Sequence, residues 1–321
     1  MSFMLTADLL LQFAQMALVL LLAPLLTGIV RTLKAQMLRR RGPPVLQPYR
    51  DLLKLVRKEA VVAENASWLY RTAPYIVSAA TFVAAALVPT FATHLAFSDI
   101  GDLIVIVGLL GTARFALALA GLDIGTSFGG IGSSREMMIA SLAEPAMLMI
   151  VFTLSLLAGS TQLSSVAVFV QGPGVGLRVS LGMALVAMIM VAIAENARVP
   201  IDNPATHLEL TMVHEAMILE YSGRHLAVIE MAAALKLLLY MSLIACMFVP
   251  WGIATPGDDL PALAVGIGSY FLKLLAGGFL LALFETGTAK MRVFRISDFL
   301  GAALMLGLLA ALLLFVSRGA T

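Results

Sequence analysis

Five charged side chains lie inside stretches of sequence that are otherwise apolar: Arg114, Glu144, Glu230, Lys236 and Lys273. A charge that faces lipid at the centre of a bilayer costs about 2.5–3.5 kcal/mol, so such residues persist where they face protein or a water-filled path. A carboxylate held there is a candidate proton carrier, and a buried ion pair is the structural alternative. We favour the functional role for Glu144 and Lys236, and leave both roles open for Glu230.

The spacing of these charges predicts which of them share a helix face. Glu136 and Glu144 are eight residues apart, which places them on roughly one face, two turns from each other. Glu230 and Lys236 are six residues apart and point to different faces. We therefore expect the first pair to share one helix face and the second pair not to form an ion pair.

The segment 195–225 is rich in residues that can exchange protons or carry charge, and it reads ENARVPIDNPATHLELTMVHEAMILEYSGRH. Its acidic residues are Glu195, Asp202, Glu209, Glu215 and Glu220. Pro200 and Pro204 prevent a continuous helix over its first part. Clustered carboxylates disfavour one another's ionisation and suit proton transfer, whereas an ordinary solvated loop is the alternative that the residues alone leave open.

Histidine and cysteine usage argues against a metal centre in this chain. Cys246 is the one cysteine, whereas an iron–sulfur cluster or a structural zinc site needs several ligands. His207 and His214 are seven residues apart, a poor spacing for joint ligation from one helix. We interpret them, with His225, as polar loop side chains, and expect no metal site and no catalytic residue here.

The segment 31–73 carries ten of the 21 lysines and arginines. Gly42-Pro43-Pro44 breaks the chain, and Pro48 can open a short helix over YRDLLKLVRK. Its leucines gather on one side, so this helix can lie along lipid headgroups with that side in the membrane. Two interpretations remain open, a topology anchor that grips anionic lipid and a docking surface for a soluble partner.

Composition places these residues in a membrane. Apolar residues make up 60% of the 321 residues and charged residues 12%, about half the share usual in soluble domains. With apolar runs near the length of a bilayer-spanning helix, the sequence predicts an all-α integral membrane protein of about eight transmembrane helices. The predicted spans are 9–30, 74–97, 100–121, 137–159, 178–194, 226–250, 262–284 and 296–316. No internal repeat is visible, so we expect 1–321 to form a single membrane domain.

Basic residues set the expected orientation. The loops 31–73, 122–136, 195–225 and 285–295 together hold sixteen of the 21 lysines and arginines. Because basic loops stay in the cytoplasm, these loops are expected there, with 31–73 as a basic first loop and both termini on the opposite side. The first residues lack a basic n-region, so we interpret them as the start of a membrane helix and not as a cleaved signal.

Three motifs carry a resemblance to a known family. They are RRRGPPVLQPYRDLLKLVRKE, then GLDIGTSFGGIGSSREMMIASLAEPAML, then ENARVPID followed by LEYSG. Together they resemble subunit 1 of respiratory complex I, the membrane subunit at the quinone site. The resemblance is closer to the membrane anchor subunits of membrane-bound nickel–iron hydrogenases of group 4, the formate hydrogenlyase and hydrogenase-4 branch, and it covers nearly the whole chain.

This resemblance implies an anchor that seats a peripheral electron-transfer arm and links it to ion translocation. Glu144 matches the glutamate of the family's fourth helix, and Arg135 the arginine before it. The family's E-x-x-R-x-P-x-D loop matches Glu195, Arg198, Pro200 and Asp202, and Glu220 with Tyr221 matches its E-Y pair. The implied proton path comprises Glu144, Glu195, Asp202, Glu209, Glu215, Glu220 and Lys236. The implied docking or chamber residues are Arg39, Arg40, Arg41, Arg50, Arg135, Glu136, Arg198 and Pro200.

The resemblance also implies partners. These are hydrogenase-like large and small subunits with an iron–sulfur protein, antiporter-like membrane subunits and membrane lipid, in a bacterial or archaeal cytoplasmic membrane. The resemblance further implies that iron–sulfur clusters and a nickel–iron centre belong to the partner subunits. The formal net charge of +2 does not indicate nucleic-acid binding.

Two departures from complex I favour the hydrogenase branch over quinone binding. The dense acidic run after P-F-D is replaced by Asn203-Pro204-Ala205-Thr206-His207, and the first basic loop is shorter. A quinone-reducing complex I subunit remains the alternative. A stand-alone ion-coupled transporter is a third, which the lack of an inverted repeat disfavours.

Overall fold

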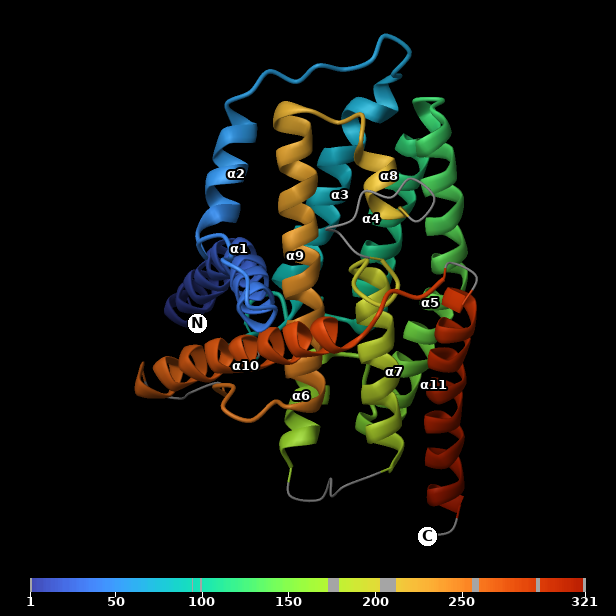
Figure 1. The fold of residues 1–321 in the computed structure, drawn as a ribbon. Helices are drawn as coiled ribbons and strands as arrows, with labels where there is room; N and C mark the ends of the chain where they lie inside the picture. The colour runs from blue at the N-terminus through green and yellow to red at the C-terminus, as the bar shows by residue number, and fades with distance from the viewer. Residues whose placement is uncertain are drawn as a thin grey trace.

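The computed structural model describes residues 2–93, 95–98, 100–172, 179–202, 212–255, 260–292 and 295–319. Eight of the helices in these residues correspond to the predicted spans (Figure 1). They are α1 (Ser2–Met37), α3 (Trp68–Leu87), α4 (Leu103–Asp123), α5 (Ser127–Ala158), α7 (Val179–Glu195), α9 (Gly223–Phe248), α10 (Leu260–Gly287) and α11 (Ile296–Gly319). Three shorter helices lie between them: α2 (Gln47–Val56), α6 (Leu163–Gln171) and α8 (His214–Ile218).

The lengths and composition of these helices fit a bilayer. Among the described residues, six helices are long and apolar enough to cross a membrane, namely α1, α4, α5, α9, α10 and α11. The apolar α7 is shorter, with 17 residues. The 20-residue α3 approaches the length that a bilayer requires but carries Arg71 in its first turn. The predicted all-α membrane protein is confirmed.

The end of α3 differs from the prediction, which extended this span to residue 97. The helix stops at Leu87, and Val88 adopts an extended conformation with φ −81° and ψ 122°. Pro89 is the physical reason, because the residue before a proline is forced away from helical dihedral angles. The chain then turns into α4, where the Asp102 side chain accepts a hydrogen bond from the Ile104 backbone and caps the helix.

The start of α5 also differs from the prediction, which placed residues 122–136 in a loop. Thr126 caps α5, because its side chain accepts a hydrogen bond from the Gly129 backbone. Residues 127–136 are therefore the first turns of α5, and the connection from α4 is short. The prediction also missed the nine-residue α6, which lies where a linker was expected.

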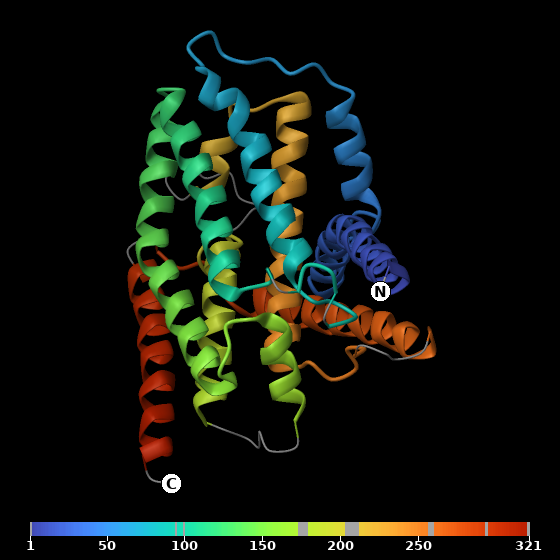
Figure 2. The same cartoon turned by 180° about the vertical axis from the view of Figure 1, so that it is seen from behind.

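Helices α3, α4, α5, α7 and α9 run alongside one another, and α10 crosses the front of this bundle steeply (Figure 1). The view from behind shows α3 and α4 side by side (Figure 2). Alanines on the buried face of α3, such as Ala73 and Ala84, have no exposed surface, and small residues let membrane helices approach closely. Gly278 does the same for α10, because a Cβ atom there would lie 3.3 Å from Leu26 of α1.

The four segments predicted to share the cytoplasmic side are linked to one another by hydrogen bonds. A hydrogen bond joins each of four pairs of segments: 31–73 with 122–136, 31–73 with 195–225, 122–136 with 195–225, and 195–225 with 285–295. The four bonds are Ser67 N to Asp123 Oδ2 (3.0 Å), Val61 N to Ser222 Oγ (2.8 Å), Arg135 Nη1 to Met212 O (2.7 Å) and Met291 N to Pro200 O (2.8 Å). We call these four segments the loop end. Isolated backbone pairings between Ala92 and Ala254 and between Asp102 and Gln162 join connections outside these four segments.

Candidate functional site: a buried cluster of charges

A buried arginine in the middle of α4 gathers three carboxylates from two other helices. The Arg114 side chain is 4% exposed. Its Nη1 atom lies 2.9 Å from Glu144 Oε1, and its Nη2 atom hydrogen-bonds to Glu195 Oε1. The Nε atom lies 3.6 Å from Glu136 Oε1, beyond direct hydrogen-bond distance. Arg114 was recognised in the sequence as a costly charge, but its partners were not.

The prediction that Glu136 and Glu144 share a helix face is confirmed, because both carboxylates face Arg114 from α5. The two differ in exposure: the Glu136 side chain is 8% exposed and the Glu144 side chain 43%. Gly111 of α4 lies beside this carboxylate, because a Cβ atom there would be in ordinary van der Waals contact with Glu144 Oε1, at 3.4 Å. Glu144 is thus the one of the three acids that reaches the outer surface of the helices.

Lys236 completes the cluster from α9. Its Nζ atom lies 3.0 Å from Glu195 Oε2, so the Glu195 carboxylate sits between two cations. The Glu195 side chain, at the end of α7, is 2% exposed. Lys236 pairs with Glu195 and not with Glu230, which is exposed on α9, as the six-residue spacing predicted. We call Arg114, Glu136, Glu144, Glu195 and Lys236 the charge cluster.

A second set of ion pairs joins the segments of the loop end. Asp202 is buried, and its Oδ1 atom lies 2.7 Å from Lys290 Nζ while Oδ2 accepts a hydrogen bond from Val213 N at 3.1 Å. These contacts order the chain after α7, where Pro200 follows a cis peptide bond.

Glu285, at the end of α10, forms a related pair of contacts. Its Oε2 atom lies 2.9 Å from Lys34 Nζ of α1, and its Oε1 atom lies 3.4 Å from Arg198 Nη1. Burial lowers the pKa of Arg198, and the neighbouring Glu285 carboxylate opposes that shift. Glu285 was not among the predicted site residues. Its position as an acid directly after the apolar span 262–284 was the available signal.

The remaining acids of 195–225 are spread apart. Glu215 is half-buried on α8 and Glu220 is exposed, while Glu209 lies outside the described residues. Tyr221 is buried, stacks on Tyr70 with ring centroids 4.0 Å apart, and donates a hydrogen bond to the Tyr70 carbonyl oxygen at 2.9 Å. Burial raises the pKa of Tyr221, so its hydroxyl remains a donor. The structure therefore does not gather all the acids of this segment into one site.

The histidine of α8 lies close to both sets of charges. Burial lowers the pKa of His214, Glu136 and Asp202 oppose that shift, and Lys236 adds to it. The residues that the structure describes contain no group of three histidine, cysteine, aspartate or glutamate side chains placed to hold a metal ion. His207 lies outside them.

The basic segment forms an exposed rim. The predicted short helix after Pro48 is present as α2, with this proline in its first turn. Four predicted docking residues, Arg39, Arg40, Arg41 and Arg50, are all exposed. We call these four residues the basic rim. Leu53 and Val56 of α2 are also 55% and 60% exposed, so this helix presents apolar as well as basic side chains.

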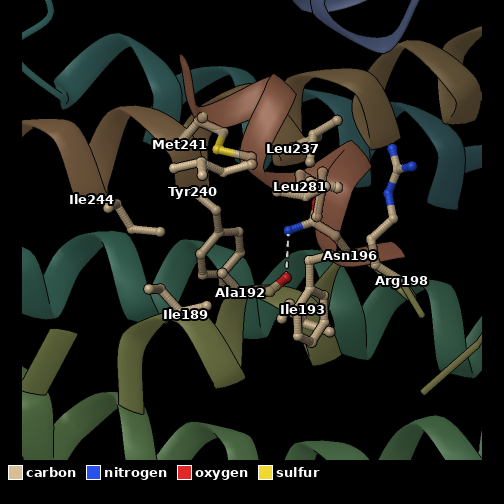
Figure 3. A pocket seen from close by; sticks show the side chains of 14 residues that line it. Ile189, Ala192, Ile193, Asn196, Arg198, Leu237, Tyr240, Met241, Ile244 and Leu281 are labelled. Carbon is tan, nitrogen blue, oxygen red and sulfur yellow. Dashed lines mark hydrogen bonds between the residues drawn. The ribbon is translucent and has the colours of Figure 1, made fainter. Parts of the chain in front are cut away.

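An apolar cavity of about 520 Å³ lies between α7, α9 and α10 (Figure 3). Ile189, Leu237 and Leu281 contribute to its walls, and Tyr240 and Arg198 are among its few polar residues. The Asn196 side chain lines it too, but donates its hydrogen bond to the Ala192 carbonyl oxygen at 2.8 Å (Figure 3). The cavity thus offers space for a hydrocarbon group.

These features define a class of protein: a helical membrane protein with charged side chains paired between its helices. The family model described as NADH dehydrogenase matches residues 10–316 of this chain. The chain belongs to that family.

Relatives within the family connect it to two kinds of complex. The chain is 34% identical to formate hydrogenlyase subunit 4 of Escherichia coli, over 84% of this chain and 87% of that protein. It is 33% identical to hydrogenase-4 component C of the same organism, over 87% of each chain. It is 30% identical to NADH-quinone oxidoreductase subunit 8 of Rhodothermus marinus, over 74% of this chain and 70% of that one.

The fold is also similar to a chain in a solved structure of the membrane-bound sulfane sulfur reductase, an archaeal respiratory membrane complex. The TM-score is 0.82, the sequence identity is 18%, and the match covers 95% of this chain and 99% of that chain. At this identity the likeness concerns the fold alone.

Proposed function

We propose that this protein is the membrane anchor subunit of a hydrogenase-type, energy-converting oxidoreductase complex in a bacterial or archaeal cytoplasmic membrane. It seats a peripheral electron-transfer arm on its loop end and links that arm to ion translocation by antiporter-like membrane subunits. The observation that carries the proposal is the charge cluster, three carboxylates and two cations that α4, α5, α7 and α9 bring together. Membership of the family and the similarity to two hydrogenase-complex subunits supply the context.

The charge cluster is suited to hold and release one proton. With all five groups ionised, three negative charges face two positive ones, so the cluster carries one excess negative charge. Uptake of a single proton makes it neutral, which lowers the cost of burial. Glu144 is the expected site of that uptake because its side chain is the most exposed of the three. When Glu144 is protonated, Arg114 keeps its contacts with Glu195 and Glu136.

A proton reaches this cluster from the loop end through groups already described. Asp202 and His214 belong to the loop end, and the lowered pKa of His214 depends on its burial and on Glu136, Lys236 and Asp202. The full proposed path is Glu144, Glu195, Asp202, Glu209, Glu215, Glu220 and Lys236. The proposed docking or chamber residues are the basic rim, Arg135, Glu136, Arg198 and Pro200.

The assembly claim is tested by purifying the native complex through an affinity tag on this chain. We expect a nickel–iron large subunit, a small subunit and an iron–sulfur protein to co-purify, with nickel and iron in the complex. The same chain expressed without its partners should bind neither metal in a stoichiometric amount. Stoichiometric metal on the isolated chain, or a wild-type preparation free of redox subunits, contradicts the proposal.

The proposal places the loop end in the cytoplasm and both termini on the other side. Cys246 is buried, so it provides little background for labelling of an introduced cysteine. A cysteine at Gly42 should react with a membrane-impermeant reagent only after cells are opened. Labelling of that cysteine in sealed cells contradicts this orientation.

Quinone reduction is the second candidate function, and the apolar cavity between α7, α9 and α10 is the observation that favours it. Its apolar walls suit an isoprenoid tail, and Arg198 and Tyr240 are polar groups within it. A photoreactive quinone analogue separates the two candidates. Labelling of this cavity that native quinone competes away supports quinone reduction, and unchanged labelling in excess quinone rejects it.

A further inference from the structure

The exposed side of α3 carries an arginine between two aromatic side chains. Trp68, Arg71 and Tyr75 are three and four residues apart, so they lie along one side of this helix, which forms part of the surface in the view from behind (Figure 2). Trp68 is 75% exposed and Tyr75 is 48% exposed, and Arg71 is exposed between them. The two aromatic residues are about 10 Å apart along the helix, which is comparable to the depth of the headgroup region, where tryptophan and tyrosine gather. This pattern places Arg71 at the level of the lipid headgroups.

A second arginine reaches the same place from α9, which packs against α3. Arg224, in the first turn of α9, is exposed. Both Arg224 and Arg71 lie within electrostatic range of the buried His225 ring. That ring also contacts Tyr75 edge to face, with ring centroids 5.7 Å apart. Two positive charges from different helices therefore meet at one patch of the surface.

The two arginines at this patch have no anionic partner within the part of the chain that the structure describes. Neither Arg71 nor Arg224 forms an ion pair or a side-chain hydrogen bond there. The imidazole of His225 carries no negative charge, and its buried Nδ1 atom has no hydrogen-bond partner among the same residues. Like charges held close together repel each other, so an anion that binds between them is stabilised by both. Guanidinium groups bind phosphate well, because they can donate two parallel hydrogen bonds to it.

The exposed side of α3 beyond Tyr75 is apolar. Ile76 is 38% exposed and Val83 is 45% exposed, and their seven-residue spacing puts them on one side of the helix. A soluble acidic protein segment would cover the arginines and leave these side chains bare. A phospholipid covers both, because its acyl chains lie along the apolar side of a membrane helix while its phosphate stays at the surface.

We propose that Arg71 and Arg224 bind the phosphate of an anionic phospholipid. The rings of Trp68 and Tyr75 flank the headgroup, and the acyl chains lie along the apolar side of α3. We call these four residues the headgroup site. The bound lipid joins the start of α3 to the start of α9, and so holds two segments of the loop end together. The proposal goes beyond the proposed function, because it requires only that the loop end meets the membrane surface.

Photocrosslinking in vesicles of known composition tests the headgroup site. The tagged native complex, with a photoreactive amino acid at Ile76, is reconstituted into vesicles of equal parts phosphatidylglycerol and phosphatidylcholine, and the adducts are identified by mass spectrometry. We expect adducts with phosphatidylglycerol to exceed those with phosphatidylcholine, which carries no net charge. Equal amounts of the two lipid adducts, or an adduct with a protein subunit in place of lipid, overturn the proposal.

Substitutions of the arginines test whether they cause this preference. Arg71→Gln and Arg224→Gln should each lower the preference for phosphatidylglycerol about fivefold, the usual contribution of one basic residue near an anionic membrane surface. Arg71→Lys keeps the charge and should retain most of the preference. Arg57→Gln is the matched control, because Arg57 is an exposed arginine of the same loop-end segment outside the headgroup site, and it should change nothing.

All these variants should assemble in wild-type amounts, because the substituted side chains are exposed. An unchanged lipid preference in both Arg71→Gln and Arg224→Gln overturns the proposal. An equal loss of preference in Arg57→Gln overturns it too, because the preference would then come from the general positive charge of the loop end.

Discussion

Lys236 on α9 lies 3.0 Å from one oxygen of Glu195 at the end of α7, and the other oxygen of that carboxylate binds Arg114 on α4. One buried acid therefore neutralises cations from two different helices. We expect Glu195→Gln to remove the negative charge that both cations share. This should lower the free energy of unfolding by about 3–5 kcal/mol, the usual cost of breaking a buried pair.

Thermal unfolding of the detergent-solubilised complex measures this loss. Glu144→Gln is the control, because Arg114 keeps two carboxylates when Glu144 is neutral. We expect Glu144→Gln to shift the midpoint much less. Equal midpoints for the two variants would mean that the double pairing of Glu195 adds nothing to stability.

Tyr221 replaces a hydrogen bond that Pro74 removes from α3. A proline has no backbone N–H, so the Tyr70 carbonyl oxygen lacks its helical donor, and the Tyr221 hydroxyl donates to it at 2.9 Å. Tyr221→Phe keeps the ring stack but leaves this buried oxygen unpaired, which costs about 1–3 kcal/mol. Thermal unfolding should show the loss, whereas Tyr75→Phe, at an exposed position on the same helix, should change little. If the Tyr221→Phe variant is as stable as the wild type, the Tyr221 hydroxyl does not stabilise α3 in this way.

His214 should make stability depend on pH. Its pKa is lowered in the folded protein, so the unfolded chain takes up this proton first as the pH falls, near its ordinary value of about 6.5. The stability that the neutral His214 side chain gives to the folded protein is therefore complete above that pH and is lost as the pH falls below it. Unfolding midpoints measured between about pH 8 and pH 5 should fall on the acid side, and His214→Gln should flatten this fall. An unchanged slope in the variant rejects the assignment.

The basic rim separates two interpretations of the first loop. If Arg39, Arg40 and Arg41 bind the peripheral arm, their replacement by glutamate should release soluble subunits from washed membranes at lower salt than in the wild type. This chain itself should stay inserted in normal amounts. If the rim is only a lipid-gripping topology anchor, the variant should instead insert poorly or in mixed orientation, with no change in the salt needed to release the arm.

Much of this architecture could be predicted from local pattern. Apolar run length gave the eight helices, and the period of the α-helix placed Glu136 and Glu144 on one face. The end of α3 was readable too, because Pro89 forbids helical angles at Val88. These features depend on neighbours a few residues apart, which a sequence displays directly.

The pairing of the charges could not be predicted in this way. Arg114 meets Glu144 across 30 residues and Glu195 across 81, and Glu285 meets Lys34 across 251. Such contacts depend on how the helices pack against one another, and a single sequence does not reveal that packing. Family resemblance supplied Glu144 and Glu195 but not the arginine between them.

The most direct test of the central claim is to measure assembly and ion-coupled turnover on the same membranes for Glu144→Gln. The substitution nearly keeps the size of the side chain and removes its ability to ionise, while Glu195 and Glu136 continue to neutralise Arg114. We predict a fully assembled complex whose coupled turnover is impaired, with a milder defect for Glu144→Asp, which keeps the ionisable group and loses only reach. Normal assembly together with fully coupled turnover in Glu144→Gln would contradict a proton-carrying role for this residue.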